Sequence, residues 1–178
     1  MRCIDQEKNQ YPRGCACACV AAVTGMSYAG VRARRLELYQ EGLAQSGLAC
    51  RSPELGRLLR RCGAQSITLS FNNANWRQEL APHELAIVAV DGKGRHYHWI
   101  VVFRRALALA RDPGCTDQAE PDDGDPWLIC DPEGGSIWSG RYLDLATPPP
   151  DRYKICPQVL HHIITPVPKR KGGKKKQS

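Results

Sequence analysis

Residues 14–25 read Gly-Cys-Ala-Cys-Ala-Cys-Val-Ala-Ala-Val-Thr-Gly, a run of small and apolar side chains without a proline or an internal glycine. Such a run predicts a largely buried helix that Gly25 ends. Cys15 stands at the N-terminal end of this helix, where the helix dipole and unpaired backbone N–H groups favour a thiolate. The stretch therefore predicts a central helix of the fold and a candidate nucleophile at its start.

The three alternating cysteines of this run have different expected roles. Cys15 and Cys19 are four residues apart and share one helix face, so Cys19 is expected to pack behind the candidate nucleophile. Cys17 projects to the opposite side and is given no role. An extended Cys-x-Cys-x-Cys run would chelate a soft metal, but a helix separates its thiols. We expect no metal and no other cofactor.

Two more helices and then a group of strands are predicted downstream. Ser27 is typical of an N-cap for a helix that ends near Gln40. Ser52 and Pro53 are typical of the cap and the first position of a third helix, which Gly63 ends. The apolar pattern then changes to a period of two, which predicts strands at 66–71, 85–90, 95–103, 127–130, 153–156 and 159–164. The strands at 85–90 and 95–103 flank Asp91-Gly92-Lys93-Gly94, a sequence typical of a hairpin turn. Helices followed by an antiparallel sheet predict an α+β fold.

Charge and composition limit the functional classes. The 178 residues carry a formal net charge of +7, and six of these charges come from the lysines and arginine of residues 169–178. We therefore expect a nearly neutral domain over residues 1–168 and a disordered basic tail over 169–178, with nucleic-acid binding unlikely except through the tail. No stretch approaches the ~18 apolar residues of a membrane span, and the first ten residues are too polar for a signal peptide. A cytoplasmic location is expected, unconventional secretion and the oligomeric state being left open.

Nine cysteines cannot all pair within one chain. In a reducing compartment Cys50, Cys62, Cys130 and Cys156 are expected to serve as small buried apolar groups. This expectation leaves Cys15 as the thiol to which chemistry is assigned.

Further along the chain are the partners that a nucleophilic thiol needs, namely a proton shuttle and a group that orients it. His98 begins the apolar run Trp99-Ile100-Val101-Val102, and Asp131 ends the run Trp127-Leu128-Ile129-Cys130. Gln10, five residues before Cys15, is a side-chain donor that could join the Cys15 backbone N–H in binding an oxyanion. The candidate catalytic residues are therefore Cys15, His98, Asp131 and Gln10.

Each partner has an alternative. Asn9 could replace Gln10 as the amide donor, and Asp112 is the second choice for the orienting carboxylate. His96 is the second choice for the base, because residues two apart share a strand face.

These motifs resemble those of a known family. Cys15-Ala16-Cys17-Ala18-Cys19-Val20-Ala21-Ala22-Val23-Thr24-Gly25 resembles the Cys-Gly-x-Ala-Cys-x-Ala-x-Val-x-Gly box of the bacterial papain-like peptidases that cut double-glycine leaders from bacteriocins, and of their stand-alone relatives. His98-Trp99-Ile100-Val101-Val102 and Ile129-Cys130-Asp131-Pro132 are similar to that family's His-aromatic-apolar strand and strand-ending Asp-Pro. Ala16 stands where the family commonly has glycine, and Gln10 lies one residue closer to the cysteine than usual.

The resemblance implies a papain-like fold and a cysteine peptidase that acts on a peptide or protein substrate. Cys15 would be the nucleophile, His98 the base and acid, Asp131 the orienting residue, and Gln10 part of the oxyanion hole. Two alternatives stay open: a catalytically degenerate papain-like binding module, and a deamidase or acyl-transfer effector or toxin domain with the same triad.

Overall fold

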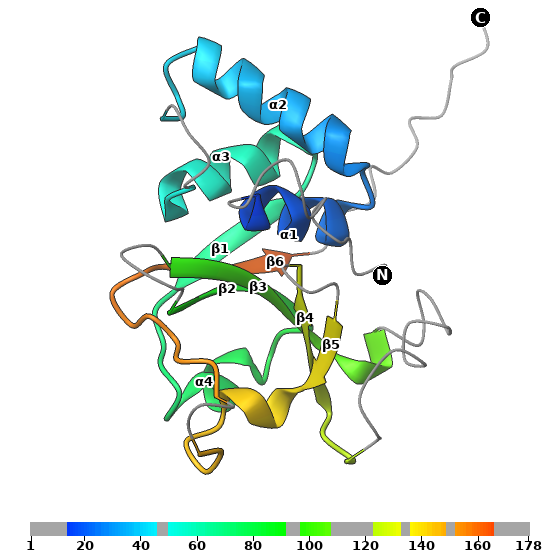
Figure 1. Ribbon diagram of the computed structural model, residues 1–178, viewed down its shortest axis with the longest axis vertical. Helices are drawn as coiled ribbons and strands as arrows, with labels where there is room; N and C mark the ends of the chain where they lie inside the picture. The colour runs from blue at the N-terminus through cyan, green and yellow to red at the C-terminus, as the bar shows by residue number, and fades with distance from the viewer. Residues whose placement is uncertain are drawn as a thin grey trace, which may run out of the picture.

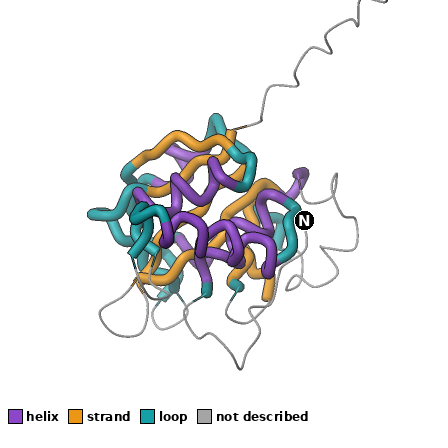
Figure 2. The backbone as a smooth tube through the Cα atoms, turned by 90° about the horizontal axis from the view of Figure 1, so that it is seen from above, coloured by secondary structure: helices purple, strands orange, loops and turns teal. Residues whose placement is uncertain are grey.

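The computed structural model describes residues 14–45, 50–91, 97–107, 123–132, 136–148 and 152–165. A layer of three helices lies on one side of an antiparallel sheet, and a short helix lies on the other side (Figure 1). Seen from above, the helices lie over the strands (Figure 2). The α+β arrangement predicted from the sequence is confirmed.

The first two helices begin and end close to where the sequence predicts. Gly25 follows the first helix with φ of 75°, and its N–H donates to Ala21 O at 2.9 Å. This left-handed conformation has little cost for glycine. The Ser27 hydroxyl accepts a hydrogen bond from Gly30 N at 3.1 Å and so caps the second helix. The helices are α1 (Cys15–Thr24), α2 (Tyr28–Gln40), α3 (Ser52–Arg61), α4 (Trp76–Leu80) and the 3-10 helix η2 (Gly140–Leu143).

The third helix has a different cap from the one predicted. Arg51 is the N-cap residue, and Ser52 is the first residue inside α3. The Ser52 hydroxyl donates to Leu160 O at 2.7 Å, a contact with a segment more than a hundred residues away that the local sequence does not reveal. Glu54 accepts a hydrogen bond from Arg51 N at 3.4 Å in place of a serine cap.

Within the described residues the sheet has six strands in the order β1-β6-β2-β3-β4-β5, and every pair is antiparallel. The predicted hairpin pairs β2 with β3, and its turn at 92–94 lies outside the described residues. Residues 153–156 are no strand, since Ile155 makes a single bridge with Val90. Three short elements, α4, η2 and β5, were not predicted from the sequence. The strands are β1 (Gln65–Leu69), β2 (Leu85–Asp91), β3 (Tyr97–Arg104), β4 (Trp127–Asp131), β5 (Ser136–Ser139) and β6 (His161–Thr165).

The central strands separate two apolar cores. Trp99 and Val101 of β3 join the core beneath the helices, whereas Ile100 and Val102 join the core on the other face. α1 belongs to the first core, and its residues from Ala16 to Val23 are all buried. Full burial of a valine or leucine side chain stabilises the fold by about 1.5–3 kcal/mol. α1 is therefore held against the sheet by its apolar side chains.

One cysteine differs from its expected state. Cys15, Cys17, Cys19, Cys50, Cys62 and Cys156 are free. Cys130 is buried as expected, but it is disulfide-bonded. The prediction that Cys130 is a free thiol is therefore wrong, because a disulfide depends on a tertiary contact that sequence spacing does not show.

Two other expectations concern regions on which the structure has limited bearing. The predicted basic tail, 169–178, lies outside the described residues. Among the residues that are described, no single helix is both long and apolar enough to cross a bilayer. α1 and α2 meet these criteria only as a pair, with a bend of 117° between them.

Candidate active site

His98 and Asp131, two of the predicted site residues, are in direct contact. The two side chains form a hydrogen bond of 2.7 Å between His98 Nε2 and Asp131 Oδ1. Each side chain is only 13% exposed, so solvent competes little for this bond. Because Asp131 takes Nε2, the second ring nitrogen, Nδ1, is left for another partner.

The register of the sheet explains this contact. β3 and β4 are antiparallel, and Val101 pairs with Cys130. Asp131 therefore comes opposite Ile100, which shares a strand face with His98 because side chains alternate along a strand. The carboxylate and the imidazole thus project from neighbouring strands toward the same side of the sheet.

Cys15 approaches from the helical layer. The Cys15 side chain lies close enough to the His98 ring to influence its protonation, as Asp131 does. Cys15 is half-buried at the first position of α1, and it is a free thiol. The structure therefore brings together a thiol, an imidazole and a carboxylate from three different elements.

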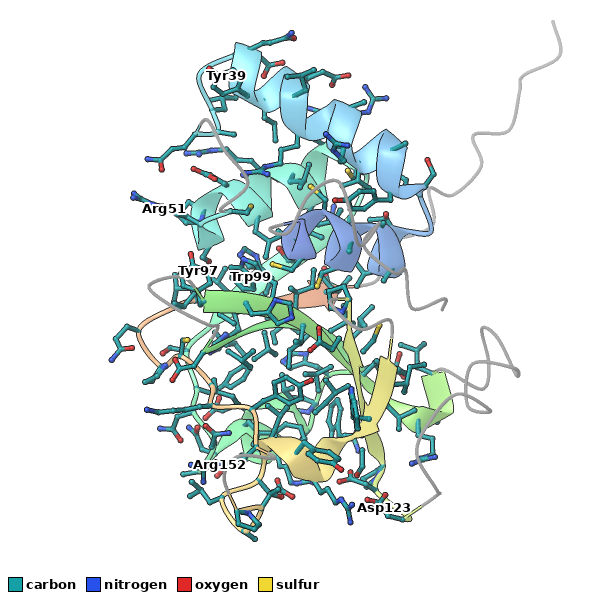
Figure 3. All side chains as sticks on the ribbon, in the orientation of Figure 1. Tyr39, Arg51, Tyr97, Trp99, Asp123 and Arg152 are labelled. Carbon is teal, nitrogen blue, oxygen red and sulfur yellow. The ribbon has the colours of Figure 1, made fainter. Side chains whose placement is uncertain are left out.

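Further polar contacts dock α1 and the adjoining loop against β3. The Cys19 thiol donates to Trp99 O at 3.3 Å, one turn after Cys15. The Trp99 indole N–H donates to Cys50 O at 2.9 Å, and its ring packs edge-on against Tyr97 at 5.2 Å between centroids. Figure 3 shows Tyr97 and Trp99 together at the level where the helices meet the sheet. Cys19 is buried one turn after Cys15, and its neighbour Trp99 directly follows His98.

The N-terminus of α1 supplies hydrogen-bond donors beside the thiol. Gly14 is its N-cap, and a glycine has no side chain with which to accept a hydrogen bond. The first hydrogen bond along the helix axis runs from Ala18 N to Gly14 O at 3.0 Å. The backbone N–H groups of Cys15, Ala16 and Cys17 precede this bond and lie at the positive end of the helix dipole. They are suited to bind a negatively charged oxygen.

The surroundings of His98 favour its charged form. Burial of the ring opposes protonation, but the hydrogen bond to Asp131 and the interaction with Cys15 outweigh it and raise the pKa of His98 to about 10. An imidazolium is thus the stable form at neutral pH. An imidazolium beside a thiol is the arrangement that stabilises a thiolate nucleophile.

The other thiols near the helix have the opposite character. Burial raises the pKa of Cys17 to about 11, although the nearby Arg35 guanidinium acts against this shift. Burial also raises the pKa of Cys19 and of Cys50. These three thiols stay protonated at neutral pH, which distinguishes them from a nucleophile.

Tyr153 is a further residue of the site that the sequence does not predict. Its hydroxyl donates to Asp131 Oδ2 at 2.8 Å, so the two carboxylate oxygens are held by different side chains. Tyr153 lies 22 residues after Asp131, outside every named strand. No spacing rule links such a residue to a carboxylate, and the sequence held no signal for it.

Several predicted alternatives cannot be compared with these residues. Gln10 and Asn9, the candidate oxyanion donors, lie outside the described residues, as do His96 and Asp112. For the imidazole and the carboxylate, His98 and Asp131 are the two candidates that the structure shows in contact.

Two other polar or hollow regions are separate from this site. A cavity of about 550 Å³ is lined by Val23 and Thr24 at the far end of α1, and by Cys62 and His83. His161, on β6, is buried and accepts a hydrogen bond from Ala89 N at 3.2 Å through Nδ1. Its Nε2 donates to Phe71 O at 3.2 Å, so both ring nitrogens serve the packing of the sheet.

Comparison with known proteins does not assign the chain to a family. No protein-family model matches it, and no curated protein is significantly similar to it. The geometry of the site is therefore the basis for its function.

Proposed function

We propose that this protein is a cysteine hydrolase that cleaves a peptide or amide bond through a thioester, with Cys15, His98 and Asp131 as its triad. The observation that carries the proposal is the hydrogen bond between Asp131 and His98, with Cys15 near enough to act on the same ring. The resemblance of the three sequence motifs to papain-like peptidases supports the same reaction and a papain-like fold. A peptide or protein is the proposed substrate.

Acylation follows from the charge state of the triad. The Cys15 thiolate attacks the carbonyl carbon, a C–S bond forms, and the carbonyl π electrons move to oxygen. The oxyanion accepts hydrogen bonds from the N–H groups at the start of α1, each such bond being worth about 3 kcal/mol in the transition state. When the tetrahedral intermediate collapses, the C–N bond breaks and the leaving amine takes the proton of the His98 imidazolium.

Hydrolysis of the thioester returns the site to its starting state. Neutral His98 accepts a proton from water, whose oxygen attacks the thioester carbonyl. Collapse of the second tetrahedral intermediate breaks the C–S bond, releases a carboxylic acid and leaves the Cys15 thiolate beside the imidazolium. Asp131 stays ionised throughout and stabilises the charged ring.

The first test is the selectivity of alkylation. A brief, low dose of iodoacetamide at pH 6, followed by peptide mass spectrometry, should label Cys15 ahead of Cys62, a free and partly exposed thiol outside the site. Burial raises the pKa of Cys62, so it provides a matched slow thiol. His98→Ala should remove the preference for Cys15, since the thiolate loses its imidazolium. Labelling of Cys62 with Cys15 untouched would overturn the proposal.

The second test is turnover. A peptide library incubated with the wild-type protein should give new termini that disappear with Cys15→Ala and persist with Cys62→Ala. New peptide termini that carry a free carboxylate identify hydrolysis of a peptide bond. Release of ammonia from glutamine side chains, or transfer of the acyl group to an added amine, would assign the same triad to deamidation or acyl transfer. A reactive Cys15 without products from any substrate would instead favour the degenerate binding module.

A further inference from the structure

A second layer of contacts lies behind Asp131. Tyr153 donates to Asp131 Oδ2 at 2.8 Å, while Oδ1 contacts His98 at 2.7 Å. The carboxylate of an aspartate can turn about its Cβ–Cγ bond, and contacts at both oxygens restrict this rotation. The Tyr153 hydroxyl therefore bears on the angle from which Asp131 meets the imidazole.

The backbone around Tyr153 is itself held firmly. Tyr153 N donates to Tyr142 O at 2.8 Å, and the Asn73 side-chain amide donates to Tyr153 O at 2.8 Å. The Asn73 carbonyl oxygen accepts from Ile155 N at 2.9 Å. Ile155 is buried and bridges to Val90. We name residues 153–156 the strap, because they cross from the 3-10 helix side to β2.

The far end of the strap is fixed to the strand that pairs with β3. Cys156 N donates to Ala89 O at 3.0 Å, and Asp91 N donates to Lys154 O at 2.7 Å. In β2, Val90 pairs with His98 on one side and bridges to the strap on the other. The strap and the backbone of His98 thus lie on either side of the same residue, which sets the position of Tyr153 relative to β3.

We propose that Tyr153 is a positioning residue of the candidate active site, which acts through Asp131 to keep the carboxylate on His98 Nε2. The catalytic meaning of this inference rests on the proposed function. The contacts of Asp131 with Tyr153 and His98 are independent of that function. Without the hydroxyl, Asp131 gains rotational freedom, its time-averaged contact with the ring weakens, and His98 holds its proton less tightly.

The test is Tyr153→Phe, which removes one oxygen and keeps the ring. We would follow the titration of His98 by NMR in the wild-type protein, in Tyr153→Phe and in Asp131→Asn, with His98→Gln to assign the signal. Tyr153→Phe should weaken proton binding by His98 about tenfold, a size typical of losing one hydrogen bond to a charged group. Tyr39→Phe, which removes the hydroxyl of an exposed tyrosine on α2, should leave the titration unchanged.

The same variants separate the two proposals. If Asp131→Asn lowers the pKa of His98 and Tyr153→Phe does not, Tyr153 has no positioning role and the proposed triad stands. If neither variant changes it, the contact between His98 and Asp131 has no influence in solution, and the proposed function loses its basis. A fall in thermal stability without a change in the His98 titration would indicate a purely structural role and overturn the inference.

Discussion

His98 Nε2 and Asp131 Oδ1 lie 2.7 Å apart, and both side chains are shielded from solvent by the fold. A pair of this kind links protonation to folding, because the charge on the ring is stabilised only where the carboxylate is held close. The stability of the protein should therefore report on the state of its candidate active site.

The first prediction concerns alkaline pH. The pKa of His98 is raised to about 10 in the folded protein. In an unfolded chain the pKa of a histidine is about 6.5. Its contribution to the free energy of unfolding is therefore fully present below about pH 6.5 and is lost as the pH rises to about 10. Urea unfolding of wild type and His98→Gln from pH 6 to 10 should show the difference between them shrinking. A difference that stays constant over this range would contradict the prediction.

The second prediction concerns acidic pH and a different histidine. Burial is the main cause that lowers the pKa of His161 to about 4. The folded protein therefore binds fewer protons than the unfolded chain between about pH 4 and 6.5. Stability should fall as the pH drops through this window. His161→Gln should be less stable than wild type at pH 7, because it loses the bonds to Ala89 and Phe71. Its further loss of stability between pH 6.5 and 4 should be smaller, as measured by urea unfolding.

The third prediction concerns the disulfide. In the denatured, unreduced protein, iodoacetamide should label the six free thiols of the described residues and leave Cys130 unlabelled. Prior reduction should make Cys130 available, and peptide mass spectrometry distinguishes the two states. Cys62 serves as the internal control, since it should be labelled in both. Equal labelling of Cys130 before and after reduction would rule the disulfide out.

The fourth prediction concerns Arg77 on α4. Its guanidinium contacts Asp125 and Asp144, with closest distances of 2.6 and 2.7 Å. Although burial opposes the charge, hydrogen bonds to both carboxylates raise the pKa of Arg77. A lysine cannot form hydrogen bonds to both carboxylates as the guanidinium does, so Arg77→Lys should lower the free energy of unfolding by about 1–2 kcal/mol. Arg77→Ala should lower it further, because the two carboxylates then lose the cation between them. Thermal unfolding of the two variants tests this order, and equal melting temperatures would refute it.

The fifth prediction concerns Gly140, the first residue of η2. A Cβ atom at this position would come within 2.6 Å of Trp127 Cβ and 3.0 Å of Trp127 O, and backbone cannot yield as a flexible side chain does. Gly140→Ala should destabilise the protein by about 1–3 kcal/mol through this overlap. Denaturant unfolding measures the effect, and an alanine variant as stable as wild type would show that β4 and η2 can separate.

Much of the fold could be predicted because its signals are local. The apolar run of α1, the Ser27 cap of α2 and the alternation around the β2–β3 hairpin each lie within a few residues. Ser52 was misjudged because its hydroxyl is engaged by Leu160, a contact made only after folding. The disulfide at Cys130 was missed for the same reason.

The candidate site could be predicted in part, and the limit has the same cause. Cys15, His98 and Asp131 each stand at an element boundary that the sequence marks. Tyr153 reaches Asp131 from a segment that forms no regular strand, held by side-chain and backbone bonds to Asn73 and β2. Such a residue is found from three-dimensional contacts and not from periodicity.

The pairing of Val101 with Cys130 makes the strand register a requirement of the proposed chemistry. A shift of β4 by one residue would turn every side chain of that strand to the opposite face. Asp131 would then point into the core beneath the helices, and Cys130 would occupy the side on which His98 projects. A single-residue insertion in β4 would thus put a sulfur in the place of the carboxylate beside the imidazole, so the proposed chemistry constrains the length of this short strand as well as the identity of its residues.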